Sequence, residues 1–363
     1  MINLYDLTFA QLTKLLDQWG FSQFHAEKVW KGLYQYLAES VDTLPEIKPS
    51  LHKRLKAETT IGRMKPITDL ASRDGDTRKF LLACEDGQSI ETVIMRYEGR
   101  RDRPEETRRF TACISSQAGC AMGCVFCATG QMGFMRHLTP GEIVGQIVFV
   151  SRLLRHAGST GSSADIAQKL RNVVLMGMGE PLHNYENTMQ AIEILTDDRG
   201  LALGPRHITL STVGLPDGIR RLADEDRLIN LAVSLHGATD KERQKLVPPA
   251  KRWPLAVLLD ACRYYSEKRN RRIFFEWTLI AFENDTAEQA HALGQLLIGM
   301  EAHINVIPLN PTDGYGGLPS DMQRVKDFQA VLAEYGLPST VRQRRGIDIA
   351  AGCGQLRQRE AEE

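Results

Sequence analysis

The apolar positions of the chain follow a helical period in residues 1–60 and a mixed pattern afterwards. Two N-terminal segments carry apolar residues at helical spacing: Leu12, Leu15, Leu16 and Trp19 in the first, and Val29, Trp30, Leu33 and Tyr34 in the second. Stripes of this kind are normally the core-facing sides of packed helices. We therefore expect residues 1–60 to form a small helical accessory domain.

Residues 61–109 are predicted to form a strand-rich connection. Two short apolar runs, Phe80–Ala83 and Ile90–Ile94, are separated by a Glu-Asp-Gly sequence that is typical of turns. The second run contains Glu91. The charged stretch from Tyr97 to Arg109 predicts a flexible link to the rest of the chain.

From residue 110 onward, strand-like and helix-like segments alternate. Apolar runs that end in polar residues or glycine fall at 172–176, 207–211, 229–234, 273–279 and 303–309. Helical patterns lie between them, and two open with capping sequences, at Thr139–Glu142 and Asp285–Glu288. About six such units predict an α/β fold with a parallel sheet, arranged as a partial (β/α)6 TIM-like barrel over residues 110–345. A C-terminal tail, residues 346–363, follows the barrel.

Composition is that of an ordinary globular protein, with 42% hydrophobic and 25% charged residues among 363. The sequence holds no apolar run of about 18 residues, so we expect no membrane span. Its first residues lack the basic segment and apolar core of a signal peptide. Seven cysteines, three of them clustered, fit a reducing cytoplasm better than a disulfide scaffold.

The formal net charge of zero argues against a protein that coats nucleic acid nonspecifically. Local basic patches nevertheless occur at 100–103 with 108–109, at 268–272 and at 342–345. Charge runs are usually solvated loops, so each patch alone is weak evidence. The last one directly precedes a C-terminal cysteine segment, which makes it the best candidate for RNA contact.

Cys120, Cys124 and Cys127 form a C-x3-C-x2-C motif, which is the most informative feature of the chain. Three thiolates on one loop suit a 4Fe-4S cluster, whose irons are each normally bound by a cysteine. With three ligands instead of four, one iron stays open to bind another molecule. A zinc knuckle is the alternative, but it normally uses repeated C-x2-C pairs, and no second pair is present.

The surroundings of the motif carry a family resemblance. Cys113-Ile-Ser-Ser-Gln-Ala-Gly precedes the first ligand, and Ala128-Thr-Gly-Gln-Met-Gly follows the last. The motif resembles that of the radical S-adenosylmethionine (SAM) superfamily, in which SAM chelates the open iron. The longer string from Cys113 to Gln146, with the C-terminal Cys353-Gly-Gln-Leu356, resembles the RlmN/Cfr family of adenosine-methylating enzymes. This resemblance implies a partial barrel, one 4Fe-4S cluster and two SAM molecules per turnover.

Polar groups at the predicted strand ends suit a SAM site, because functional groups of parallel barrels collect where strands end. A Gly177-Met-Gly179-Glu180 sequence follows one apolar run, and its glycines allow a ligand to approach the backbone. By resemblance, the SAM-contacting positions are Gly179, Glu180, Ser211, Ser234, Leu235, His236 and Asn310. His236 alone would more often be a satisfied structural histidine.

The resemblance assigns roles to Cys353, Cys113 and Glu91. Cys353 lies in a segment of small residues and would carry a methyl group from SAM, whereas Cys84 and Cys262 fit buried inert thiols. Radical chemistry would join that methyl carbon to an adenine ring carbon, which has no lone pair with which to attack SAM. Glu91 would accept the ring proton, and Cys113 would attack Cys353 to release the product with a transient disulfide.

We therefore predict a radical SAM methyltransferase that acts at C2 of an adenosine in 23S rRNA, in the peptidyl transferase centre, and of a tRNA anticodon loop. Methylation of the same rRNA adenosine at C8, the antibiotic-resistance activity, uses the same five cysteines and stays open. An RNA-binding protein with structural zinc and a radical SAM enzyme for small molecules or proteins are alternatives. Expected partners are these RNAs and a flavodoxin or ferredoxin electron donor, for a monomeric cytoplasmic enzyme.

Overall fold

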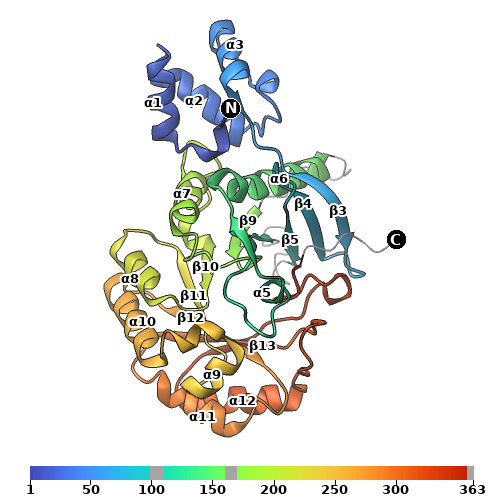
Figure 1. Cartoon of the computed structure of the whole chain (residues 1–363), viewed down its shortest axis with the longest axis vertical. Coiled ribbons are helices and arrows are strands. Elements are labelled where there is room, and N and C mark those ends of the chain that lie inside the picture. Colours follow the sequence, from blue (N-terminus) through green and yellow to red (C-terminus); the bar gives the residue numbers. More distant parts are fainter. Residues whose placement is uncertain (99–108, 160–169, 358–363) are drawn as a thin grey trace.

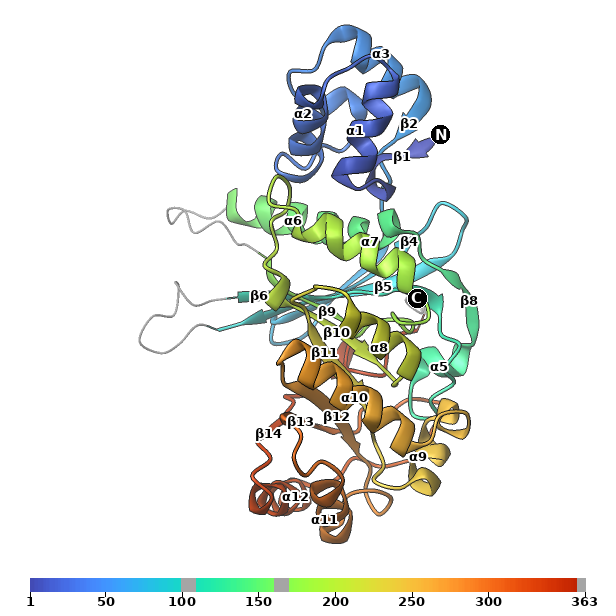
Figure 2. The same cartoon turned by 90° about the vertical axis from the view of Figure 1, so that its left-hand side faces the viewer.

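The N-terminal helices form a separate layer at one end of the molecule, beyond helix α6 (Figures 1 and 2). The computed structural model describes residues 1–98, 109–159 and 170–357. Helices α1 (Phe9–Gln18), α2 (Gln23–Tyr34) and α3 (Pro49–Glu58) confirm the helices expected in this region. Strands β1 (Ile2–Asn3) and β2 (Thr59–Thr60) pair in parallel and close the layer. Trp30 and Tyr34 are buried in it, as the apolar spacing predicts.

The core of the molecule is one sheet of ten strands, in the order β14-β13-β12-β11-β10-β9-β6-β5-β4-β3. The strands are β3 (Lys65–Ala71), β4 (Thr77–Ala83), β5 (Ser89–Tyr97), β6 (Arg109–Cys113), β9 (Leu170–Leu175), β10 (Ile208–Thr212), β11 (Asn230–Ser234), β12 (Ile273–Leu279), β13 (Ala302–Pro308) and β14 (Ser339–Val341). Neighbours from β6 to β14 are parallel, whereas β3 to β6 pair antiparallel.

Helices between the parallel strands cover the outer side of the curved sheet (Figures 1 and 2). They are α6 (Pro140–Ser159), α7 (Tyr185–Thr196), α8 (Pro216–Asp224), α10 (Leu255–Arg269), α11 (Ala287–Leu296) and α12 (Met322–Glu334). The short helix α9 (Asp240–Leu246) instead lies near the cysteine motif, where Val125 N donates to Leu246 O at 3.1 Å. The alternation confirms the predicted α/β partial barrel, since each crossover between neighbouring parallel strands carries a helix. In the described residues, no helix is long and apolar enough to cross a membrane.

The structure adds strands that the apolar pattern does not reveal. Strand β3 lies at the sheet edge with mostly exposed residues, and β14 has only three residues, so neither leaves a clear apolar period. Strands β3 to β5 extend the barrel sheet itself. Most of the predicted flexible link lies outside the described residues, but Tyr97 ends β5 and Arg109 begins β6. Our division into regions 1–60, 61–109, 110–345 and 346–363 stays a proposal.

The two predicted capping sequences have different outcomes. Thr139 and Glu142 form the expected box, with Glu142 N donating to Thr139 Oγ1 at 3.2 Å and Thr139 N donating to Glu142 Oε2 at 2.9 Å. The second box is shifted by one residue, because Thr286 caps α11 and pairs with Gln289. Asp285 instead accepts hydrogen bonds from Ser320 Oγ and Arg324 Nη1.

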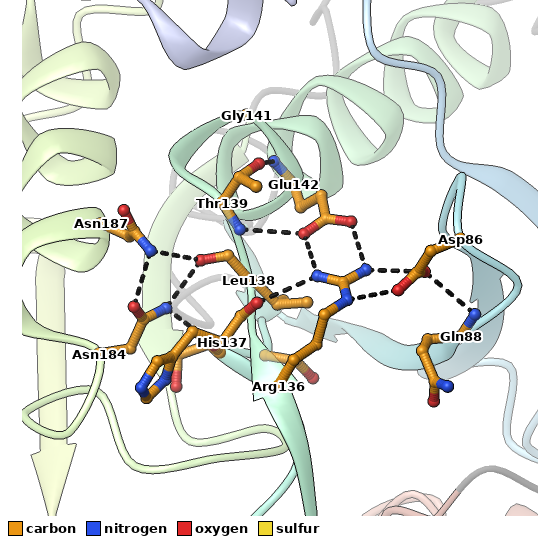
Figure 3. A network of polar contacts seen from close by, with 12 residues as sticks. Asp86, Gln88, Arg136, His137, Leu138, Thr139, Gly141, Glu142, Asn184 and Asn187 are labelled. Atoms are coloured by element: carbon orange, nitrogen blue, oxygen red, sulfur yellow. Dashed lines mark hydrogen bonds and ion pairs between the residues drawn. The ribbon is translucent and has the colours of Figure 1, made fainter.

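A hairpin of β7 (Gln117–Gly119) and β8 (Phe134–His137) flanks the cysteine motif. Figure 3 shows Arg136 of β8 between Asp86 and Glu142. Its Nη1 and Nη2 donate to the Glu142 carboxylate at 2.7 and 2.8 Å, and its Nε and Nη2 donate to Asp86 at 2.5 and 2.8 Å. This two-sided contact ties the hairpin to α6 and to the β4–β5 turn.

Candidate functional site

The three cysteines of the motif lie on one loop that faces a single cavity. Cys120 directly follows β7, and Cys127 is the N-cap of α5 (Ala128–Met132). All three thiols are free and line this cavity. Burial raises the pKa of Cys120 to about 12 and also raises the pKa of Cys124 well above its usual range, so a positively charged centre is needed to hold them as thiolates.

The spacing of these thiols favours a multinuclear centre over a single zinc ion. Tetrahedral zinc–thiolate bonds of about 2.3 Å place the sulfurs only about 3.8 Å apart. In the described part of the chain, the ligand atoms gathered within 4.8 Å are those of Cys84, Asp86 and Glu142, and not the three loop thiols. An iron–sulfur cluster, with one thiolate on each of three irons, fits the wider arrangement. We do not assign a metal to the Cys84 group, because Arg136 already forms ion pairs with both of its carboxylates.

The glycine turn after β9 is shaped by close contacts. Gly179 has φ +104°, and a Cβ there would lie 2.6 Å from Gln117 Cβ, so only glycine fits. Glu180 is buried, and its two oxygens accept backbone hydrogen bonds from Leu182 at 3.0 Å and Val213 at 2.7 Å. Desolvation raises the pKa of Glu180 to about 7, although these hydrogen bonds by themselves would lower it. Both residues line the same cavity as the cysteines.

The ends of β10 and β11 supply further polar groups to this cavity. Ser211 and Ser234 line it, as expected. Leu235 is buried and not among its lining residues, and its backbone N donates to Glu276 O at 3.0 Å. His236 lines the cavity in a structural setting: its Nδ1 accepts from Thr278 N at 2.9 Å. Burial lowers the pKa of His236 to about 3, so its ring is neutral.

Asn310 connects the cavity to the C-terminal segment. Its Nδ2 donates to Cys353 O at 3.0 Å, and its Oδ1 accepts from Arg344 Nε at 3.3 Å. Ala128 N, at the start of α5, donates to Gly354 O at 2.7 Å. The segment around Cys353 is therefore folded over the mouth of the barrel against the cysteine loop.

Cys353 borders two cavities at once. It lines the cavity of the three cysteines, which we call the cluster cavity, and also a second one, which we call the basic cavity. Of these two cavities, Cys113, at the end of β6, lines the basic one. Cys353 is accessible to solvent. Protein atoms nevertheless lie close around its thiol, and this partial desolvation raises the pKa of the thiol. Burial raises the Cys113 pKa to about 12.

The basic cavity is cationic. Its lining contains five arginines and, among the described residues, no Asp or Glu: Arg109, Arg206, Arg342, Arg344 and Arg345. Tyr97 also lines it, with the Arg109 and Arg345 guanidinium carbons 4.9 and 4.5 Å from its ring centroid. Of the three basic patches expected from the sequence, 342–345 is thus part of this cavity. Patch 268–272 instead pairs with Asp224 and Asp226. Of the patch 100–103 with 108–109, Arg109 lines the cavity and the other residues lie outside the described part of the chain.

Glu91 lies beside the basic cavity but does not line it. It is on the same face of β5 as Val93, which does. Its Oε1 is 2.8 Å from Lys79 Nζ, and its Oε2 accepts from Arg357 N at 2.7 Å. The C-terminal segment therefore covers the carboxylate in this conformation.

The sequence analysis missed Glu276, which also lines the cluster cavity. Its Oε1 accepts from Asn305 Nδ2 at 2.8 Å and from Arg342 Nη2 at 3.2 Å, and its Oε2 is buried with no hydrogen-bond partner among the residues that the structure describes. A lone charge inside the apolar run Ile273–Leu279 is the signal that points to it, because a buried charge requires partners. Lys79 leaves no comparable signal.

Comparison with known proteins agrees with the geometry. Residues 114–293 match the family model of the radical SAM superfamily, and residues 2–61 match that of the ribosomal RNA large subunit methyltransferase N-terminal domain. A dual-specificity RNA methyltransferase RlmN 1 of Myxococcus xanthus is 62% identical over 98% of this chain and 94% of its own length. The ribosomal RNA large subunit methyltransferase N of Nitrosopumilus maritimus is 41% identical over 98% and 99%.

A solved structure extends this agreement to three dimensions. The crystal structure of a radical SAM methyltransferase from Sphaerobacter thermophilus has a TM-score of 0.90 at 41% identity, and covers 98% of this chain and 99% of that one. The similarity therefore includes both the barrel and the N-terminal helical layer. The chain belongs to the RlmN family of SAM-dependent radical SAM methyltransferases.

Proposed function

We propose that the enzyme methylates C2 of an adenosine in 23S rRNA, in the peptidyl transferase centre, and of a tRNA anticodon loop, with Cys353 as methyl carrier. The observation that carries this proposal is the place of Cys353 in the wall between two cavities. One cavity has thiol ligands and a buried carboxylate, which suits a cluster and SAM. The other is cationic, which suits RNA. The dual specificity named for the Myxococcus relative supports two RNA substrates.

In the cluster cavity, Cys120, Cys124 and Cys127 would hold one 4Fe-4S cluster, as membership of the radical SAM superfamily implies. When bound, the cluster and SAM supply the radical that activates the methyl group. Glu180 would accept the SAM ammonium group. The SAM site would be completed by the other expected residues that line this cavity: Gly179, Ser211, Ser234, His236 and Asn310. We propose two SAM molecules per turnover, one for the Cys353 methyl and one for radical formation.

In the basic cavity, the arginines would contact phosphates while one adenosine enters toward Cys353. Enzymes that react with a base take it out of the stack, and RNA is read mainly in such unstacked nucleotides. Arginine suits this task because its planar group binds phosphate at two points. The absence of acidic lining residues in the described chain removes repulsion of the backbone.

Two residues on this side would complete the reaction. Glu91 would accept the proton from the adenine ring carbon once the C-terminal segment uncovers it. Cys113 would then attack the Cys353 sulfur: a disulfide forms, the bond from the Cys353 sulfur to the transferred methylene carbon breaks, and that carbon takes a proton to become the methyl group. An external flavodoxin or ferredoxin as electron donor, and a monomeric enzyme, stay predictions.

The test is mass spectrometry of 23S rRNA and tRNA from cells with this gene, without it, or with Cys353→Ala. We expect 2-methyladenosine to be present only with the intact gene. An 8-methyladenosine product would replace our assignment by the C8 alternative. Unmethylated RNA in cells that contain the intact enzyme would refute the proposed substrate.

A further inference from the structure

The loop that carries Cys353 rests on a buried ion pair in the sheet extension. Lys79 lies in β4 and Glu91 in β5, where the register pairs Lys79 with Val93 and Leu81 with Glu91. The two charged residues are therefore diagonal neighbours on one face of the sheet. Lys79 Nζ is 2.8 Å from Glu91 Oε1, and the side chains are only 8% and 1% exposed.

Each partner of this ion pair also holds one side of the loop. Lys79 Nζ donates to Ala350 O at 3.2 Å, three residues before Cys353. Glu91 Oε2 accepts from Arg357 N at 2.7 Å, four residues after Cys353. One pair of opposite charges thus fastens both sides of the loop to neighbouring strands.

We propose that Lys79 is a positioning residue, which through Glu91 and the Ala350 carbonyl keeps the Cys353 thiol in the wall between the two cavities. The proposal rests on the proposed function of Cys353 as methyl carrier. Loss of one partner of a buried ion pair leaves an uncompensated charge, and here it also removes a backbone anchor. A reacting group displaced by about 1 Å can cost about 100-fold in rate.

The same contact makes two states of the site mutually exclusive. While Arg357 N occupies Glu91 Oε2, the loop is fastened and the carboxylate is covered. Glu91 can turn to the basic cavity only when this hydrogen bond opens. The contact of Glu91 with Lys79 uses the other carboxylate oxygen, Oε1, so it does not depend on the hydrogen bond to Arg357 N.

Hydrogen exchange of the holoenzyme tests the fastening directly. We expect backbone exchange in residues 346–357 to be at least tenfold faster in Lys79→Met than in the unmodified protein, and near normal in Lys79→Arg. Arg78→Met is the matched control, because Arg78 directly precedes Lys79 in the same strand and pairs with Asp69 at the surface. Unchanged exchange in Lys79→Met, or faster exchange spread over the whole chain, would overturn the proposal.

A double variant distinguishes the loss of the loop anchors from the destabilising effect of a buried, unpaired charge. Lys79→Met with Glu91→Leu removes both charges, so neither is left buried alone, but both anchors of the loop are lost. We expect fast exchange in residues 346–357 to persist in this variant. Slow exchange there would show that the ion pair does not fasten the loop.

Activity gives an independent readout. We expect Lys79→Met to lower kcat for RNA methylation about 10- to 100-fold with a KM for RNA within twofold, and Lys79→Arg to restore it. SAM cleavage should continue while RNA methylation slows, because Lys79 itself does not line the cluster cavity. If the unmodified protein methylates no RNA, the proposed function fails, while the exchange comparison still decides the role of Lys79.

Discussion

At the scale of single residues, Cys353 and Cys113 differ in where they lie and therefore in what their loss should do. Cys353→Ala removes the methyl carrier, so neither protein nor RNA should be methylated. Cys113→Ala keeps the carrier but lacks the attacking thiol in the basic cavity. It should accumulate a covalent protein–RNA adduct, seen on a denaturing gel as a band that nuclease removes. Normal turnover of Cys113→Ala would contradict the disulfide step.

Glu180 gives a second prediction at this scale, through pH. A glutamate of the unfolded chain loses its proton near its ordinary pKa of 4.5, whereas burial raises the pKa of Glu180 in the folded protein to about 7. Between these values the folded protein binds more protons, so its free energy of unfolding falls as pH rises from about 4.5 to about 7. Glu180→Gln should remove about 3 kcal/mol of this pH dependence. Urea unfolding of both metal-free proteins at pH 5 and pH 7.5 measures this change in the free energy of unfolding. The same pH dependence in Glu180→Gln and in the unmodified protein would argue against a desolvated carboxylate.

At the scale of elements, the β7–β8 hairpin holds the cysteine loop through Arg136. Arg136→Met leaves Asp86 and Glu142 facing each other without a cation. This should lower the free energy of unfolding by about 1–3 kcal/mol. Because the hairpin leads directly into Cys120, the cluster should also be lost faster under a chelator, as followed by visible absorbance. Arg221→Met is the control, because it removes an exposed ion pair between Arg221 of α8 and Glu186 of α7. Equal rates of cluster loss in the two variants would mean that the hairpin does not support the loop.

At the scale of the whole molecule, the two cavities on either side of Cys353 predict that SAM and RNA binding can be weakened separately. Arg206→Gln, in the basic cavity, should weaken RNA binding and lower the slope of log affinity against log salt by about one. SAM affinity should be unchanged. Arg221→Gln, outside this cavity, is the matched control. Filter binding across a salt series measures both, and a loss of SAM affinity in Arg206→Gln would contradict the division.

Part of this architecture can be predicted from the sequence alone. Hydrophobic periods locate α1, α2 and the strands β9 to β13, because each buried element must present an apolar face with its own spacing. The cysteine motif locates the cluster loop because its ligands are adjacent in the chain. Polar strand ends place Glu180, Ser211 and Asn310 at one cavity, since parallel strands bring their carboxyl ends together. These features depend on local spacing, which a sequence displays directly.

Other features depend on contacts between distant segments, and only the tertiary structure decides them. Lys79 and Ala350 are 271 positions apart, and Arg357 meets Glu91 across 266. No local pattern marks such partners, because a side chain buried by a remote segment looks like any other charged residue of an exposed strand. The position of Cys353 between two cavities has the same origin. The sequence by itself determined the chemistry that the chain carries, and the fold decided which groups meet, because a contact needs both partners at one place in space.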